Sequence, residues 1–185
     1  MREIELKIHD MSTTLYPADA YALVLEEVDG GRKLPIIIGH LEAQAIKVMM
    51  VKYRPPRPLT HDLFHSLTDE LGVTLKKMVI YKAKDGVFYS HLYFDKEGEE
   101  IKIDSRTSDA VALALRYKCP MYAVENVVEA EHLHDLGEGK FSVPITSVSL
   151  QMLEDALKKA IEKEDYEQAS HLRDEIRRRK EEGNQ

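Results

Sequence analysis

The fold is decided by residues 73–104, which read VTLKKMVIYKAKDGVFYSHLYFDKEGEEIKID. Two dipeptides in which glycine follows a polar residue, Asp85-Gly86 and Glu97-Gly98, divide this stretch into runs rich in β-branched and aromatic residues. Such dipeptides favour tight turns, and the runs between them favour extended backbone. The sequence therefore predicts a meander of three strands, at residues 73–82, 87–94 and 100–104.

The residues that precede the meander predict further strands. Apolar and charged residues alternate at residues 4–8, as they do in a half-buried strand. Two apolar runs, at residues 21–25 and 34–38, flank Asp29-Gly30-Gly31, whose glycines favour positive φ. A hairpin is the expected structure for these two runs.

Two helices are expected between this hairpin and the meander. Apolar residues recur at helical spacing from Leu41 to about Tyr53, where a proline-rich segment ends the helix because proline supplies no backbone donor. Thr60 is the expected N-cap of a second helix, which has Asp62 in its first turn and which Gly72 ends.

After the meander, a helix is expected from Ser108 to just before Pro120, followed by a short strand at residues 121–124. Strands and helices therefore do not alternate one for one along the chain. The order of a hairpin, two helices, a meander, a helix and a strand predicts an α+β fold, a mixed β-sheet domain with packed helices.

The C-terminal part of the chain predicts an antiparallel helical hairpin. Glycines and a proline indicate a connector, and beyond it apolar residues recur at helical spacing over residues 150–161 and 166–176. Two helices of this length bury little apolar area alone, so they are expected to pack on the main domain, on another copy or on a different protein. We expect three parts: a domain at 1–135, a connector at 136–147 and a hairpin at 148–182.

Composition excludes several classes of protein. The formal net charge of −7 over 185 residues argues against a general nucleic-acid coat protein, although it leaves room for a local basic patch. No apolar run is long enough for a membrane span, and the N-terminus lacks the apolar core of a signal peptide. Cys119 has no partner for an internal disulfide. A cytoplasmic protein without membrane contact is expected, and glycine-rich phosphate loops, zinc-protease motifs and serine-hydrolase motifs are absent.

Polar residues gather where the meander ends and the next helix begins. Asp104 and Asp109 offer carboxylates that suit a divalent cation, and Arg106 between them suits a phosphate oxygen. Glu42, in the opening turn of the first helix, is a further carboxylate for the same ion. The alternative is structural: Ser108 caps the helix, the carboxylates complement helix dipoles, and Arg106 pairs with Asp104.

His61 and Asp62 form a second candidate cluster. An imidazole beside a carboxylate suits a general base. His65 lies four residues further along the same helix face, so the two histidines also have a weaker interpretation as metal ligands. The alternative is a pair of exposed polar residues at the start of a helix.

A basic strip lies on this otherwise acidic protein, because no acidic residue occurs between Ala43 and His61. The strip contains one tyrosine and four cations: Tyr53, Lys47, Lys52, Arg54 and Arg57. Such a strip can follow a phosphate backbone while its tyrosine stacks on a base. Scattered, solvated cations are the alternative.

Several blocks of the sequence resemble, in order, the pattern of the bifunctional nuclease family. They are Leu34-Pro35-Ile36, Glu42-Ala43, Pro56-Arg57-Pro58, Thr60-His61-Asp62-Leu63, Gly86-Val87-Phe88-Tyr89 and Asp104-Ser105-Arg106 with Ser108-Asp109. The stretch from Leu150 to Arg179 resembles a UVR motif, as found in UvrB and UvrC. The first resemblance implies cleavage of both DNA and RNA, and the second implies a helical hairpin that mediates protein–protein contact.

On this basis we expect a nuclease that hydrolyses phosphodiester bonds of DNA and RNA, with single strands as the favoured substrate. The expected ligands of a catalytic Mg²⁺ or Mn²⁺ are Glu42, Asp104 and Asp109. The expected catalytic residues are His61 as general base, Asp62 as the residue that orients it, and Arg106 as the phosphate ligand. The residues expected to guide the strand are Lys47, Tyr53, Arg54 and Arg57.

A second function remains open at this point. In it the domain is a non-enzymatic, oligomeric scaffold whose polar blocks are caps and ion pairs, and the UVR hairpin recruits a protein partner. Under either function a homo-oligomer is expected, because the apolar stripe of the hairpin needs to be covered.

Overall fold

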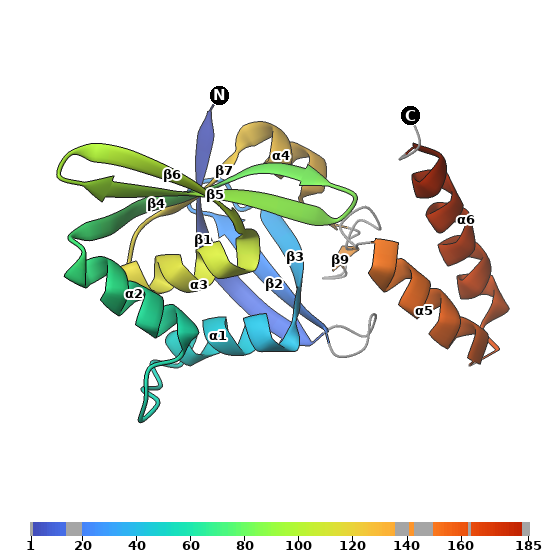
Figure 1. Cartoon of the computed structure of the whole chain (residues 1–185). Helices are drawn as coiled ribbons and strands as arrows, with labels where there is room; N and C mark the ends of the chain where they lie inside the picture. The colour runs from blue at the N-terminus through green and yellow to red at the C-terminus, as the bar shows by residue number, and fades with distance from the viewer. Residues whose placement is uncertain (1, 14–19, 136–140, 143–149, 163, 183–185) are drawn as a thin grey trace.

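The computed structural model describes residues 2–13, 20–135, 141–142, 150–162 and 164–182. These residues form a curled, mixed seven-stranded sheet with packed helices and a C-terminal pair of helices, so the α+β expectation is confirmed (Figure 1). The strand order is β3-β2-β1-β7-β4-β5-β6. The strands are β1 (Glu3–Thr13), β2 (Ala20–Glu27), β3 (Lys33–Gly39), β4 (Val73–Lys84), β5 (Val87–Lys96), β6 (Glu99–Arg106) and β7 (Met121–Val124).

The meander β4-β5-β6 forms as its turn dipeptides predict. Asp85, Gly86, Glu97 and Gly98 all have positive φ, between 52° and 88°, which is the conformation that two-residue hairpin turns require. The strands pair antiparallel with Lys84 opposite Val87 and Lys96 opposite Glu99, so each loop contains only the two expected residues.

A second antiparallel unit, β1-β2-β3, contains the predicted N-terminal hairpin. The two units are joined through β7, which pairs antiparallel with β1 and parallel with β4. The parallel pairing sets Met78 opposite Met121 and Ile80 opposite Ala123. Residues far apart in the sequence thereby share one sheet and one core.

Three helices pack together beside the sheet: α1 (His40–Met50), α2 (Thr60–Glu70) and α3 (Thr107–Tyr117). Their boundaries are close to those predicted, but two caps differ. The N-cap of α2 is Leu59 instead of Thr60, and its amide donates to the Asp62 carboxylate at 2.9 Å. The N-cap of α3 is Arg106 instead of Ser108, which lies inside the helix. In the first turn of α3, the buried Thr107 hydroxyl forms a hydrogen bond of 2.7 Å with the buried Ser90 hydroxyl.

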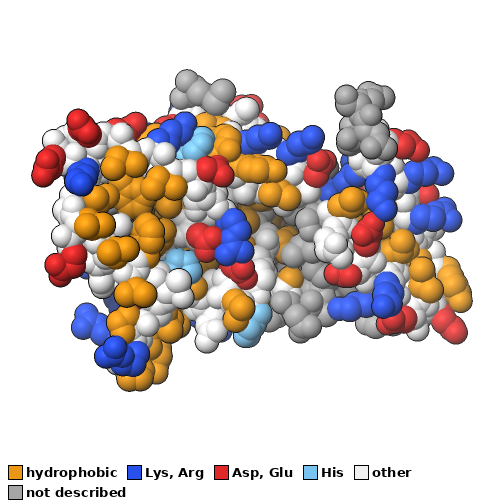
Figure 2. All heavy atoms as spheres, viewed as in Figure 1, with side chains coloured by type: hydrophobic (Ala, Val, Ile, Leu, Met, Phe, Trp, Pro, Cys, Tyr) orange, Lys and Arg blue, Asp and Glu red, His pale blue; other side chains and the backbone are white. Residues whose placement is uncertain are grey.

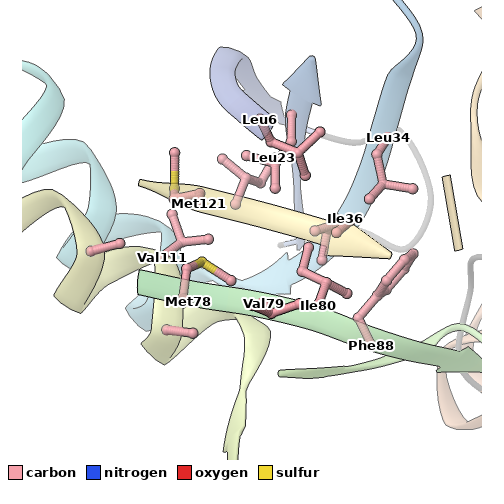
Figure 3. Close-up of a cluster of buried hydrophobic side chains, with 14 of the residues drawn as sticks. Leu6, Leu23, Leu34, Ile36, Met78, Val79, Ile80, Phe88, Val111 and Met121 are labelled. Atoms are coloured by element: carbon pink, nitrogen blue, oxygen red, sulfur yellow. The ribbon is translucent and has the colours of Figure 1, made fainter. Parts of the chain in front are cut away.

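The core gathers buried side chains from the strands and from the helices, and Figure 3 shows part of it. Side chains from both antiparallel units meet there, and α3 contributes Val111. Leu23, Met78, Ile80 and Val111 have no exposed surface. Cys119 packs against this core, and burial raises the pKa of its thiol to about 11, so the thiol is not an activated nucleophile.

A fourth helix and a small strand pair were not predicted. Helix α4 (Glu125–Glu131) follows β7 directly and buries Val127 and Val128 against the core. It is too short to show helical periodicity in the sequence. The strand pair consists of β8 (His134–Asp135) and β9 (Phe141–Ser142). Most of the predicted connector at 136–147 lies outside the described residues.

The C-terminal helices α5 (Leu150–Glu162) and α6 (Tyr166–Glu182) pack on each other, as predicted. Their shared apolar seam is Leu153, Ala156, Ala160, Ala169, Leu172 and Ile176. Glu164, with φ at 59°, helps the chain to reverse between the helices without a glycine. No described helix has the length and apolar character that crossing a membrane requires.

The parallel junction gives a prediction about stability. Met78→Ala removes a fully buried side chain from β4. It should lower the free energy of unfolding by about 2–5 kcal/mol, because the site loses apolar burial and is left with a cavity. Urea denaturation followed by far-ultraviolet circular dichroism measures this change. The control is Lys76→Ala, an exposed position on the same strand. Equal midpoints for the two variants would contradict the assigned core.

Candidate active site

The candidate site lies where three helices begin. Each of α1, α2 and α3 has an acidic residue in its first turn: Glu42, Asp62 and Asp109, respectively. A carboxylate is stabilised there by the positive end of the helix dipole. Figure 2 shows acidic and basic side chains gathered near the start of α3.

Arg106 links two of these helix starts. Its guanidinium donates from Nε to Asp109 Oδ2 at 2.7 Å, from Nη2 to Asp109 Oδ1 at 3.1 Å, and from Nη1 to Glu42 Oε1 at 2.9 Å. Gly39 makes room for this arrangement, because a Cβ there would lie 2.5 Å from Glu42 Oε2. The Arg106 side chain is still 67% exposed, so the bridge stands open to solvent.

His61 reaches the same carboxylate from α2. Its Nε2 lies 3.2 Å from Asp109 Oδ1, and its side chain is 20% exposed. Hydrogen bonds from His61 and then from Arg106 outweigh burial and lower the pKa of Asp109 to about 2. Asp109 is therefore ionised at neutral pH and accepts the Nε2 proton. In neutral His61 this leaves Nδ1 as the ring's proton acceptor.

Asp62 does not orient His61, contrary to the expectation from its position in the sequence. Its Oδ1 accepts from Arg116 Nε at 2.5 Å, and its Oδ2 accepts from the Leu59 amide. Burial alone would raise the pKa of Asp62, but the hydrogen bonds from Leu59 and Arg116 outweigh it and hold the pKa below its usual value. Asp62 therefore fixes the start of α2 and neutralises a buried cation.

Asp104 lies away from the other two predicted metal ligands. It sits on β6 opposite His91 and accepts a hydrogen bond from the Tyr81 hydroxyl at 3.2 Å. In the part of the chain that the structure describes, no group of three or more His, Cys, Asp or Glu side chains is arranged to hold a metal ion. As they lie here, Glu42, Asp104 and Asp109 do not fit a shared ion, and the need for a cation stays a prediction. His65 instead lies 3.5 Å from Asp69.

The predicted basic strip lines two hollows beside these helices. Lys47 and Tyr53 border one of about 320 Å³, and Tyr53, Arg54 and Arg57 border a second of about 390 Å³. The second hollow is also lined by Asp62 and Arg116, so the strip adjoins the residues next to His61. A third hollow, of about 220 Å³, is bordered by Glu42 and Arg106. The structure thus brings the strip and the polar cluster to neighbouring helices.

Arg116 was not predicted as a site residue from the sequence. Its side chain is 3% exposed and donates to Asp62 and to the carbonyl oxygens of Ala45 and Ala112. Its Nη2 finds no hydrogen-bond partner among the described residues. One signal was available: Arg116 is the only charged residue between Asp109 and Lys118, in an apolar helix. A cation at such a position needs a buried partner.

Comparisons with known proteins agree with the resemblance in the sequence. The family model described as "Bifunctional nuclease domain" matches residues 23–135, and the model described as "UvrB/uvrC motif" matches residues 148–182. An uncharacterised protein of Mycobacterium tuberculosis is 45% identical over 112 residues, which are 60% of this chain and 66% of that protein.

Two plant relatives are more distant. Bifunctional nuclease 1 of Oryza sativa subsp. japonica is 31% identical over 108 residues, 56% of this chain and 33% of the relative. Bifunctional nuclease 1 of Arabidopsis thaliana is 26% identical over 127 residues, 66% of this chain and 39% of the relative. The chain thus spans 66% or less of the length of each of these curated relatives.

The contact between His61 and Asp109 predicts how the Asp109 carboxyl titrates when His61 is replaced. His61→Phe removes the hydrogen bond that most lowers the pKa of this carboxyl, so the titration midpoint should rise from about 2 toward 3.8. Because the folded-state pKa is depressed, this group stabilises the fold above about pH 4 and loses that contribution as the pH falls toward 2. The acid-induced loss of stability should therefore become shallower in the variant.

Carbon NMR of the Asp109 carboxyl measures the midpoint. The control is His65→Phe on the same helix, whose imidazole lies near Asp69 and not near Asp109. An unchanged Asp109 midpoint in the His61 variant would show that the pair does not form in solution.

Proposed function

Because the chain belongs to the bifunctional nuclease domain family, we propose that it hydrolyses phosphodiester bonds of DNA and RNA. The observation that carries the proposal is the chain of contacts His61–Asp109–Arg106–Glu42, which sets an oriented imidazole beside an exposed guanidinium. Phosphodiester hydrolysis needs a proton acceptor for water and a cation for the phosphate, and this cluster offers both.

In this proposal Arg106 binds the scissile phosphate. Three of its N–H groups donate to Asp109 and Glu42, which leaves one N–H on each Nη atom for a phosphate oxygen. The bidentate bond to Asp109 holds the guanidinium plane in place, so little side-chain freedom is lost on binding. Glu42 keeps the far end of the group from rotating.

His61 is the proposed general base. With Nε2 held by Asp109, Nδ1 takes a proton as the oxygen of water bonds to phosphorus. The bond from phosphorus to one ester oxygen breaks, and the imidazolium returns its proton to that oxygen. Asp109 stays ionised throughout, because its pKa of about 2 lies far below neutral pH. Its role is to orient the imidazole and stabilise its charged form.

The strand is proposed to run along the hollows beside α1 and α2. Tyr53 is 57% exposed between them and offers a ring for stacking, while Lys47, Arg54 and Arg57 offer exposed cations for phosphates. A stacking tyrosine needs unpaired bases, so single strands are the proposed substrate.

The experiment is cleavage of a labelled single-stranded DNA and RNA oligonucleotide by the purified chain. His61→Gln and Arg106→Gln should each lower the rate by about 10²–10⁴-fold, since each loses a group that acts at the reacting phosphate. The matched control, Asp69→Asn, alters a carboxylate near His65 and should cleave normally. Wild-type rates in both site variants would refute the assigned residues, and no cleavage by the wild type would refute the nuclease.

The same assay tests the cation. Reactions with Mg²⁺, with Mn²⁺ and with EDTA are compared, and Asp104→Asn is added as a variant. If the predicted ion is used, EDTA stops cleavage. If Asp104 is one of its ligands, Asp104→Asn needs more metal for half-maximal rate. Cleavage that persists in EDTA would contradict a role for the ion, but it would not contradict the proposed roles of His61 and Arg106.

We also propose that the helical hairpin is a protein-contact module and that it supports self-association. The UVR motif match covers it, and two large side chains at its turn are exposed: Ile161 at 53% and Tyr166 at 68%. Both lie beyond the seam that joins α5 to α6. In this proposal a second copy of the chain covers them.

Light scattering of the full chain tests this module. The change Ile161→Glu with Tyr166→Glu should lower the molar mass to that of the monomer without altering thermal stability, because neither side chain is buried. Glu162→Lys, an exposed neighbour, serves as the control. A wild-type chain that is already monomeric, or an unchanged mass in the double variant, would contradict the proposal.

A further inference from the structure

The side of the meander that faces away from the buried residues of β5 carries an unusual set of side chains. We call it the aromatic face and define it by five rings and three lysines: Tyr81, Tyr89, His91, Tyr93, Tyr122, Lys77, Lys82 and Lys102. The rings come from β4, β5 and β7, and each is only half-buried. None of these residues belongs to the candidate active site or to the basic strip.

Strand alternation explains why the rings share one side. On β5, Phe88, Leu92 and Phe94 are buried in the core, so the residues between them point outward. The residues that point outward are Tyr89, His91 and Tyr93. A strand with one face in the core usually carries small polar or charged side chains on the other. Three outward rings in a row stabilise the sheet through cross-strand pairs, and they also leave an aromatic surface open to a ligand.

The rings lie next to one another in a connected series. Tyr81 and His91 are stacked, with centroids 3.8 Å apart and planes 9° from parallel. The centroid of Tyr81 lies 6.3 Å from that of Tyr89, and the centroid of His91 lies 6.3 Å from that of Tyr93. Burial first, and then Lys102, lower the pKa of His91, so its ring is neutral at neutral pH. The planes of Tyr81 and Tyr89 are tilted by 54°, and those of His91 and Tyr93 by 80°, so the rings offer several differently oriented surfaces on which bases can stack.

Lysines surround the rings. Lys82 lies 5.2 Å from the Tyr89 centroid, and Lys77 and Lys102 lie 5.0 and 5.7 Å from the Tyr93 centroid on its two sides. Lys77 is also bonded to Glu3, whereas Lys82 and Lys102 form no ion pair with any described residue. Asp104 is an acidic neighbour on β6, and its carboxylate accepts from the Tyr81 hydroxyl. Asp95 and Glu100 share this side of the sheet, two residues beyond Tyr93 and Lys102. The two unpaired lysines therefore offer local sites for an anion beside Tyr89 and Tyr93.

The aromatic face ends at the candidate site. Along the β5–β6 ladder, Lys102 is opposite Tyr93, Asp104 is opposite His91, and Arg106 is opposite Tyr89. Two residues of a strand span about 6.6–6.8 Å, so a ligand that follows the three rings of β5 arrives beside Arg106.

We infer that the aromatic face binds single-stranded nucleic acid and leads it toward Arg106. Bases stack on the tyrosines while phosphates meet Lys82 and Lys102. The inference rests on the proposed function for the choice of nucleic acid as ligand. The two lysines favour the same choice, because an apolar protein partner would bury them without supplying a counter-charge of its own, at a large desolvation cost. A single strand supplies an aromatic surface and a negative charge in every nucleotide.

The test is binding of fluorescently labelled twelve-nucleotide single strands, DNA and RNA, to the full chain in EDTA. Anisotropy is read over a range of salt concentrations, and gels confirm that the probe stays intact. Lys82→Gln with Lys102→Gln should weaken binding about tenfold and reduce the salt slope by about 1.4, from about 0.7 for each lost phosphate contact. The control, Lys118→Gln with Lys158→Gln, makes the same charge change at exposed positions outside the face.

A second variant tests the rings. Tyr89→Leu with Tyr93→Leu keeps apolar bulk but removes two stacking surfaces, and it should weaken binding at least fivefold with little change in the salt slope. Circular dichroism checks its fold. If this variant does not fold, the lysine pair decides the result, because both lysines are exposed.

Failure of the inference is distinct from failure of the nuclease proposal. Wild-type affinity in the lysine and tyrosine variants would overturn the aromatic face even if the protein cleaves. Binding that these variants weaken would support the face even if the wild type cleaves nothing. A wild type that binds neither strand would also overturn it. So would variants that change the molar mass in light scattering but not the affinity, since the face would then join copies of the chain.

Discussion

The parallel pairing of β4 with β7 is the constraint on which the structure depends. It joins two antiparallel units into one sheet and sets Met78 against Met121 at their junction. Strands that run parallel need a long connection, and the connection from β4 to β7 carries α3. The connection from β3 to β4 carries α1 and α2, and both of these helices pack against α3. The candidate site exists because the sheet closes in this way.

At the site, one guanidinium balances charges that would otherwise repel. Glu42 and Asp109 each lie at the start of a helix, where the dipole stabilises a carboxylate, but together they need a cation. Arg106 supplies it from the last residue of β6. The hydrogen bond from His61, and then the bonds from Arg106, lower the pKa of Asp109 to about 2, so His61 has an ionised partner. The cluster is also open to solvent, unlike the Asp62–Arg116 pair, whose arginine is 3% exposed.

Arg106 also connects the polar cluster at the helix starts with the aromatic face. Its guanidinium contacts the helix starts, whereas its backbone lies opposite Tyr89 at the edge of the aromatic face. The basic strip along α1 and α2 reaches the neighbourhood of the same cluster through the hollow that Asp62 and Arg116 line. If both surfaces bind a single strand, the scissile phosphate lies where they meet. The acidic total charge does not oppose this, because binding depends on local charge.

The sequence by itself determined the elements and the family. Strand alternation, the glycine turns after Asp85 and Glu97, and the prolines after Tyr53 specify local backbone conformation, which depends on near neighbours. The short helix α4 was not predicted because it has too few residues to show a helical repeat of apolar positions. Alternation also places Tyr89, His91 and Tyr93 on one side of β5, but it does not say which side is the core.

Only the tertiary structure decided which side chains meet. His61 and Asp62 are adjacent in the sequence, yet consecutive residues of a helix point in different directions, so His61 reaches Asp109 while Asp62 reaches Arg116. Asp104 and Asp109 are close in the sequence, yet Asp104 lies beside the aromatic face, opposite His91, and Asp109 lies in the first turn of α3. Such pairings depend on how distant segments pack, and a pattern of neighbouring residues carries no record of that packing.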